Sequence, residues 1–371
     1  MIVNIFDIRT IAVLSLLAFC LSCAKNDETG SGIQDPVLVW KQKLPGQSGR
    51  IMTGYGNNLL LQRILAIDKK TGNTQWTLDT HWELAAYHRL CDSTLLFQDV
   101  GLHTGSAGMV NMNTGKLLWK KDFGNPQVSP KFPVTCMTPN GNIFYTSDYG
   151  FHRLNVATGI FSAVFNLPPM GVMHRPFTFT NTSGNEKVMF GLPGFTGANQ
   201  GIMLWDVRTE QVIWQNPNIG IRSTLSFGYD RGNIYVSNAD TLYKISEMSG
   251  TISWKVKLEN PEYSPGAISI RENRLYYQNN TLRCYDVNTG NQYWSTNTAP
   301  TKIMPYHDWV VGIVQVPSNY KDYLVAIHSV SGKSSWKINS EANITSFFAD
   351  PLEKRIYVTD SNEYLYCFEV P

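Results

Sequence analysis

The sequence is poor in charged residues and shows no sustained helical pattern. Charged residues make up 16% of the 371 residues, against roughly a quarter in average soluble domains. After the N-terminal apolar segment, no stretch repeats apolar residues with the ~3.6-residue period of an amphipathic helix. The formal net charge of +2 gives no electrostatic basis for binding nucleic acid. These shortages predict a chain of strands and exclude a nucleic-acid-binding class.

Motifs for catalysis and metal binding are also missing. There is no Gly-x-Ser-x-Gly turn, no His-Glu-x-x-His helix motif and no glycine-rich phosphate loop. The six cysteines include no Cys-x-x-Cys pair, so no zinc site is expected. Cys91 and Cys136 could form a bridge, whereas Cys284 and Cys367 occupy the same position in different units and should stay apart. We therefore expect no catalytic residues, no metal ligands and no cofactor.

What the sequence does have is a recurring tryptophan, which usually follows a short Asp-x-x-Thr-Gly turn. Seven such tryptophans are separated by 36, 43, 95, 40, 40 and 42 residues. The interval of 95 holds a degenerate unit with Ala163 in the tryptophan position, and Glu210 replaces the glycine of the next turn. The repeat residues are Trp40, Trp76, Trp119, Trp214, Trp254, Trp294, Trp336, Gly72, Gly115, Gly159, Gly250, Gly290 and Gly332.

This period predicts an all-β fold, a single eight-bladed β-propeller of four-stranded antiparallel blades. Each unit contains alternating strands bounded by Gly, Asn and Asp. The last unit lacks an outer strand, which residues 37–43 can supply, so the N-terminal strand is expected to close the last blade. Because a tryptophan buries a large flat ring and glycine adopts positive φ freely, these residues are expected to fasten blades rather than form a site.

The segment containing Asp68, Thr71, Gly72 and Trp76 resembles the tryptophan-docking repeat of quinoprotein-like (PQQ-like) propellers, and the resemblance covers residues 36–371. Enzymes of that family have a disulfide between adjacent cysteines, calcium ligands and a catalytic Asp. This sequence has no adjacent cysteines, so the resemblance implies the fold without PQQ. The family also includes scaffold lipoproteins, and the chain is similar to those of the outer-membrane barrel-assembly machine.

The N-terminus resembles a bacterial lipoprotein signal. The apolar run from Ile11 to Leu21 is too short to span a bilayer comfortably, and Ser22 precedes Cys23. The predicted parts are a signal peptide (1–22), a polar tether (23–35) with lipidated Cys23, and a propeller (36–371). Residues 25–28 resemble a Bacteroidetes surface-export signal, and a plain linker is the alternative. Either way an outer-membrane lipoprotein is expected, facing the periplasm or the cell surface.

Loops before the inner strands of a propeller meet at one mouth of its channel, where distant residues can form a binding site. Basic residues near these loops predict a mouth that attracts an acidic partner, while solvated strand ends are the alternative. Two further loops each combine an imidazole and a carboxylate. The candidate residues are Arg50, His81, Glu83, Lys131, His174, Arg175, Arg222, Lys302, His307 and Asp308.

We therefore expect a membrane-anchored, non-catalytic binding scaffold that presents its loops to an envelope protein or a glycan. The alternative is a glycan-related enzyme with a metal or acid/base site at the mouth, which would use His81, Glu83, His174, Arg175, His307 and Asp308. The irregular stretch 168–200, which follows the unit that has lost its tryptophan, is expected to be the part best freed for binding.

Overall fold

The computed structural model shows an all-β chain. All the regular secondary structure that it describes consists of β-strands. Within the described ranges, no helix is long and apolar enough to cross a membrane. The predicted signal peptide, Cys23 and Gly159 lie outside those ranges. The described residues are 34–371 except 46–49, 62–64, 79–83, 92, 101–104, 124–133, 138–142, 148–149, 156–159, 167–175, 193–200, 221–224, 239, 260–265 and 317–320.

The strands pair into four-stranded antiparallel sheets. The first four sheets contain β2 (Ile51–Tyr55), β3 (Asn58–Leu61), β4 (Leu65–Asp68) and β5 (Thr74–Thr77); β6 (Leu84–Cys91), β7 (Thr94–Val100), β8 (Gly105–Asn111) and β9 (Leu117–Phe123); β10 (Val134–Met137), β11 (Ile143–Ser147), β12 (Gly150–Asn155) and β13 (Ile160–Asn166); and β14 (Phe177–Thr180), β15 (Glu186–Leu192), β16 (Gly201–Asp206) and β17 (Gln211–Asn216).

Three further sheets follow in chain order. They contain β18 (Ser226–Asp230), β19 (Asn233–Ser237), β20 (Thr241–Ser246) and β21 (Ile252–Lys257); β22 (Ala267–Arg271), β23 (Arg274–Gln278), β24 (Leu282–Asp286) and β25 (Gln292–Thr296); and β26 (Pro300–Tyr306), β27 (Trp309–Val314), β28 (Tyr323–His328) and β29 (Ser334–Asn339).

The remaining sheet joins the two ends of the chain. It contains β30 (Ile344–Asp350), β31 (Arg355–Asp360) and β32 (Tyr364–Glu369) in its inner positions. β1 (Val37–Lys43) pairs antiparallel with β32, and Trp40 lies opposite Cys367. The first and last strands of the described chain therefore belong to one sheet.

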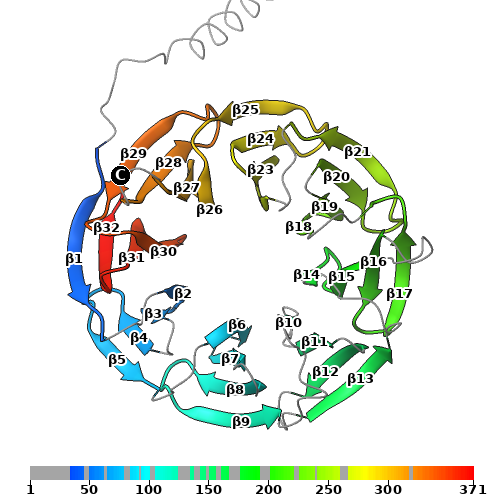
Figure 1. Cartoon of the computed structure of the whole chain (residues 1–371), viewed down its shortest axis with the longest axis horizontal. Helices are drawn as coiled ribbons and strands as arrows, with labels where there is room; N and C mark the ends of the chain where they lie inside the picture. Colours follow the sequence, from blue (N-terminus) through cyan, green and yellow to red (C-terminus); the bar gives the residue numbers. More distant parts are fainter. Residues whose placement is uncertain are drawn as a thin grey trace, which may run out of the picture. The chain divides into compact units, whose positions relative to one another are not determined.

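The sheets are arranged around a central axis, with strands such as β2, β14 and β30 innermost and β1, β5 and β17 outermost (Figure 1). Inner strands of successive sheets contact one another, as β26 does β30 and β30 does β2. Apolar residues are buried between neighbouring sheets. One such cluster joins Tyr306 and Val311 to Phe347 and Val358 of the next sheet. The prediction of an all-β propeller with four-stranded antiparallel blades is confirmed.

Among the described residues, the recurring tryptophan fastens one sheet to the next at five junctions. The indole N–H donates to a backbone carbonyl in the following sheet at 2.6–3.2 Å. The ring lies over the turn glycine, where a Cβ would come within 2.6–3.0 Å of ring atoms. These glycines have φ between 69° and 75°. The five pairs are Trp40 with Gly72, Trp76 with Gly115, Trp214 with Gly250, Trp254 with Gly290, and Trp294 with Gly332.

In the turns that begin with aspartate, the carboxylate holds the backbone through hydrogen bonds. Asp68 Oδ1 accepts the N–H of Lys70 at 3.0 Å and that of Thr71 at 2.8 Å. At Asp286, a hydrogen bond from the Tyr293 hydroxyl, followed by those from Thr289, lowers the carboxyl pKa to about 2. These turns are therefore held by local hydrogen bonds that do not involve the docked ring.

Trp336 is an exception. It faces the sheet whose outer strand is β1, and because β1 is not joined to β32 by a turn, no Thr-Gly turn receives it. Its side chain is 2% exposed, and its ring meets that of Trp309 edge-on at 5.8 Å. Trp336 therefore acts as an ordinary core residue of the last junction.

A second exception lies between the sheet β10–β13 and the sheet β14–β17. In the other sheets the residue before the tryptophan is bulged, but β13 shifts register one residue after Ala163, between the residues paired with His152 and Phe151. The next turn carries Glu210 at φ 56°, and an ion pair at 3.3 Å joins it to Arg153 of β12. Tryptophan and glycine are thus lost together, and an exposed ion pair links these sheets instead.

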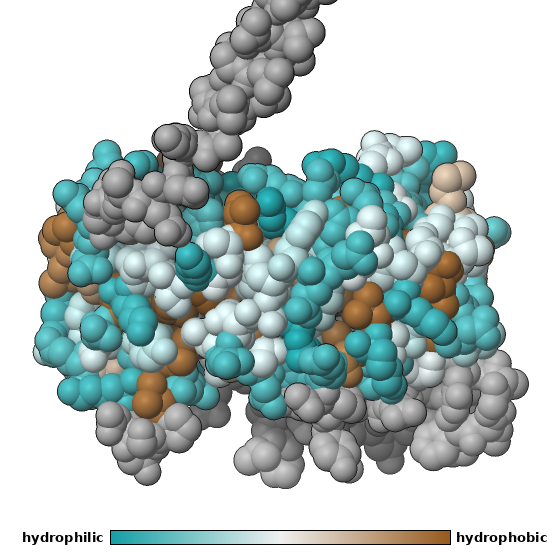
Figure 2. All heavy atoms as spheres, turned by 90° about the horizontal axis from the view of Figure 1, so that it is seen from above, coloured by the Kyte–Doolittle hydropathy of each residue, from teal (hydrophilic) through white to brown (hydrophobic). Residues whose placement is uncertain are grey.

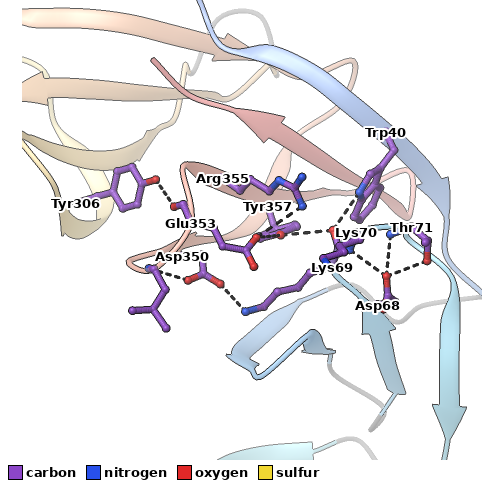
Figure 3. Close-up of polar contacts among 11 residues, drawn as sticks. Trp40, Asp68, Lys69, Lys70, Thr71, Tyr306, Asp350, Glu353, Arg355 and Tyr357 are labelled. Carbon is purple, nitrogen blue, oxygen red and sulfur yellow. Dashed lines mark hydrogen bonds and ion pairs between the residues drawn. The ribbon is translucent and has the colours of Figure 1, made fainter.

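The junction between the first and last sheets is polar and buried (Figure 3). The indole of Trp40 donates to the carbonyl of Lys69, whose ammonium forms an ion pair with Asp350. These two side chains are only 6% and 3% exposed. The Tyr357 hydroxyl donates to the Glu353 carboxylate at 3.4 Å. Because removing one partner of a buried ion pair costs about 3–5 kcal/mol, this junction is held by more than its tryptophan.

Replacing Gly250 with Ala should destabilise the protein by about 2–4 kcal/mol, since the methyl group meets the ring of Trp214 in addition to straining a positive φ. Gly232→Ala is a matched control, because Gly232 has φ 78° and nothing lies within 4 Å of the place that a Cβ would take. It should cost only about 1–2 kcal/mol. Urea unfolding of both variants measures the difference, and equal losses would show that the ring is irrelevant.

The altered junction predicts coupling between positions 163 and 210. Ala163→Trp alone should destabilise, because the side chain of Glu210 stands where the other turns have room for a ring. Combined with Glu210→Gly, it should be better tolerated, with a coupling of about 0.5–3 kcal/mol. A double-mutant cycle by chemical denaturation measures this coupling. Additive effects would mean that the two losses are unrelated.

Candidate functional site

Three adjacent inner strands begin irregularly, all at the same end of the ring. Their register shifts lie between Ile51 and Thr53 in β2, Pro300 and Ile303 in β26, and Ile344 and Ser346 in β30. β6 also shifts near its start, whereas β10, β14, β18 and β22 pair regularly with their neighbours. Bulges re-aim side chains and often lie beside functional sites. We call residues 50–53, 300–303 and 344–347 the bulged arc.

In β26 the bulge places Thr301 and Lys302 opposite a single residue, Ile313. Gly312 makes room for it, because a Cβ there would lie 2.4 Å from the Pro300 Cβ and 2.7 Å from the Lys302 carbonyl oxygen. The side chain of Lys302 extends to within 5.5 Å of the Phe347 ring centroid on β30. A glycine thus fixes the irregular start of β26.

Buried hydroxyl groups connect the bulges of β30 and β2. The backbone N–H of Ile51 donates to Ser346 Oγ at 2.6 Å. Ser346 Oγ in turn lies 2.7 Å from Thr359 Oγ1, and Thr345 Oγ1 lies 2.9 Å from the same atom. Ser346 is 3% and Thr359 0% exposed. The two strands are therefore held in a fixed relation at this end.

Two cations flank β30 in the bulged arc. Arg50 directly precedes β2, Lys302 lies in β26, and both side chains are exposed. Desolvation by the surrounding protein, and then repulsion from Arg50, lower the pKa of Lys302. Neither cation forms an ion pair with a carboxylate among the described residues. The arc therefore carries two positive charges that form no ion pair with a carboxylate in the described part of the chain.

The nearby carboxylates are already engaged. Backbone N–H groups of Val316 and Ile344 bond the carboxylate of Asp322, although its burial raises its pKa overall. Asp360 is fully buried and accepts the Tyr366 hydroxyl at 2.7 Å. Both carboxylates accept hydrogen bonds inside the protein, and neither forms an ion pair with Arg50 or Lys302 among the described residues.

The predicted site residues divide into three groups. Arg50 and Lys302 lie near enough for Arg50 to lower the pKa of Lys302, and both belong to the bulged arc. His307 and Asp308 form the turn after β26, about 16 Å along the strand from Lys302 at ~3.3 Å per residue. Their predicted place at the same mouth is wrong, because an inner strand runs from one end of the channel to the other. The candidates outside the described residues are His81, Glu83, Lys131, His174, Arg175 and Arg222.

The stretch 168–200 is also corrected in part. It was expected to be irregular, but it contains β14 and β15. Phe177 and Phe179 of β14 stack on Phe227 and Tyr229 of β18, with centroids 5.9 and 4.1 Å apart. These aromatic residues join two sheets, so this part of the stretch is structural.

Sequence reasoning missed the residues that build the bulged arc. Ser346 and Thr359 gave no signal, because nothing local shows that two hydroxyls from different strands will meet. Gly312 did give one, since it interrupts the apolar strand β27 and an isolated strand glycine indicates a bulge or a close backbone approach. Figure 2 shows apolar residues scattered among hydrophilic ones on one face of the molecule. Exposed apolar residues on the outer strands include Leu118 of β9 and Ile213 of β17.

Comparison with known proteins gives a family and a fold. The family model described as "Outer membrane protein assembly factor BamB" matches residues 33–132, 62–161 and 198–307, more than half of the chain. No curated protein matches the chain.

Three solved structures are similar at low identity. The computationally designed protein Ika8 is 13% identical with a TM-score of 0.66, over 91% of this chain and 100% of its own. Sqt1 of Saccharomyces cerevisiae is 12% identical with a TM-score of 0.66, over the same shares. The Dos1 propeller is 10% identical with a TM-score of 0.64, over 90% of this chain and 95% of its own. Such identities show the fold alone.

Replacing Lys302 with Met should stabilise the protein slightly near neutral pH, by less than about 1 kcal/mol for so exposed a group. Because the pKa of Lys302 is lowered in the folded protein, the unfolded chain binds the proton more tightly, and the charged lysine destabilises the fold. This destabilisation is present below the folded-state pKa and disappears as pH rises toward the ordinary lysine pKa of about 10.5. Thermal unfolding of both proteins at about pH 7 and pH 10 measures this. A gain that does not shrink at the higher pH would contradict it.

Proposed function

This chain belongs to the outer membrane protein assembly factor BamB family, and from that premise we propose that it is a non-catalytic scaffold that binds a protein partner outside the cytoplasm. The observation that carries the proposal is the bulged arc. There, three neighbouring inner strands depart from the regular pattern, and Arg50 and Lys302 carry charge that no described carboxylate neutralises. Natural proteins accept such local costs where a surface binds something.

The scaffold is proposed to be a ring of eight blades closed by β1. Support comes from the eight four-stranded sheets of the described residues, from the pairing of β1 with β32, and from the buried Lys69–Asp350 ion pair at that junction. In a closed ring the inner strands have fixed neighbours on both sides, which suits a rigid binding surface.

The proposed location is the outer membrane, with a lipid on Cys23 and a short polar tether before β1. The sequence motif around Cys23 and the family membership support this. The partner is accordingly proposed to be an envelope protein, with a glycan as the alternative. An enzymatic role is not favoured, because His307 and Asp308 lie at the other end of β26 from the bulged arc.

Site-specific photo-crosslinking in the native envelope tests the scaffold proposal. A photoreactive amino acid at position 301, in the β26 bulge, should give a reproducible adduct with a protein. The same amino acid at position 308, at the far end of β26, is the matched control and should not give that adduct. Thr301 and Asp308 are both exposed, so both probes are accessible. Absence of any protein adduct at 301, or the same adduct from 308, would overturn the proposal.

A further inference from the structure

The bulged arc has the properties of a built binding site for negative charge. We infer that it binds a carboxylate-rich, extended segment of a protein partner, through Arg50 and Lys302. This inference rests on the proposed scaffold function and adds the chemistry of what that scaffold recognises.

The first support is that the two cations are held together by structure. Arg50 adjoins Ile51, whose N–H bonds Ser346, and the next residue, Phe347, lies under the ammonium of Lys302. Gly312 keeps the bulge that carries Lys302 in place. The backbone that carries Arg50 is therefore held against β30 by a hydrogen bond, and the ammonium of Lys302 lies over a ring on β30.

The second support is electrostatic. Desolvation by the surrounding protein, and then repulsion from Arg50, lower the pKa of Lys302. A bound carboxylate would offset the repulsion between the two cations. Arg50 can bind a carboxylate with two parallel hydrogen bonds, while Lys302 supplies a point charge.

The third support concerns the form of the ligand. β2, β26 and β30 are the innermost strands of their sheets, so one edge of each faces the channel rather than another strand. An extended peptide can use such backbone groups as well as the charges, which is a common mode of peptide recognition. The adjacent Thr301 is exposed and adds a hydroxyl beside the cations.

The test measures binding of a labelled oligo-glutamate peptide to the full-length chain, with an oligo-glutamine peptide of equal length as the uncharged control. Glutamate should bind tighter, and its affinity should fall as salt is added. Lys302→Met and Arg50→Gln should each weaken binding about tenfold, the effect of ~1.4 kcal/mol. Lys302→Arg should retain most of the affinity, because it preserves the charge.

Two controls separate lost binding from lost folding. Lys116→Met removes an exposed lysine from the turn before β9, at the opposite end of the ring, and should bind like the parent. Lys302→Met should unfold no earlier than the parent, so its weaker binding cannot come from instability. Gly312→Ala retains both cations but disturbs the bulge, so it should weaken binding with Lys302 still present.

Equal binding of the two peptides, or glutamate binding that survives both Lys302→Met and Arg50→Gln, would overturn the inference. Tighter, Lys302-dependent binding of polygalacturonate than of oligo-glutamate would also overturn it, in favour of an anionic glycan. The crosslinking outcome is independent. A protein adduct at position 301 without selective glutamate binding would support the scaffold proposal and overturn only the acidic ligand. Selective glutamate binding without a protein adduct at position 301 would overturn the scaffold proposal.

Discussion

The fold depends on one contact, a tryptophan ring lying over a glycine of the neighbouring sheet. The glycine is often credited with allowing the turn's positive φ. Glu210 adopts φ 56° in the corresponding turn, so the backbone alone does not demand glycine there. What demands it is the ring, which at the five docked turns leaves no room for a Cβ. Where no tryptophan arrives, at the sheet after Ala163, a glutamate is tolerated and pairs with Arg153. Tryptophan and glycine thus behave as one unit shared between two sheets.

This explains how much of the fold the sequence could reveal. Each dock repeats the same local signals, an Asp68-type turn, a glycine and a tryptophan, so sheet type and the role of these residues could be predicted from spacing. Trp336 could not be distinguished from the docking tryptophans, because its different environment depends on which strand forms the outer edge of the neighbouring sheet. The prediction that His307 and Asp308 lie at the same mouth as the basic residues was wrong for a similar reason. Residue spacing does not show which end of an inner strand a turn occupies.

The candidate site was predictable only through its charges. Arg50 and Lys302 are visible in sequence as basic residues near the starts of strands, but their proximity depends on β26, β30 and β2 being neighbours in space. The bulges that distinguish this side depend on contacts such as Ser346 with Ile51, which join residues far apart in the chain. Gly312 was the one local indication of a bulge, and its meaning is clear only once the neighbouring strand β26 is known.

The position of the bulged arc has a physical rationale. Unpaired cations and interrupted ladders weaken the sheets that hold them, so they need strong support nearby. The arc lies at one end of the junction between the first and last sheets, and the Trp40 dock and the buried Lys69–Asp350 pair fasten the same junction. The hydrogen bond from the Ile51 N–H to Ser346 Oγ adds a third link across this junction, within the arc itself. The junction after β13 has only an exposed Arg153–Glu210 pair in place of a dock, and such pairs contribute little. A costly binding surface is therefore better supported between β30 and β2 than at the junction that lost its tryptophan.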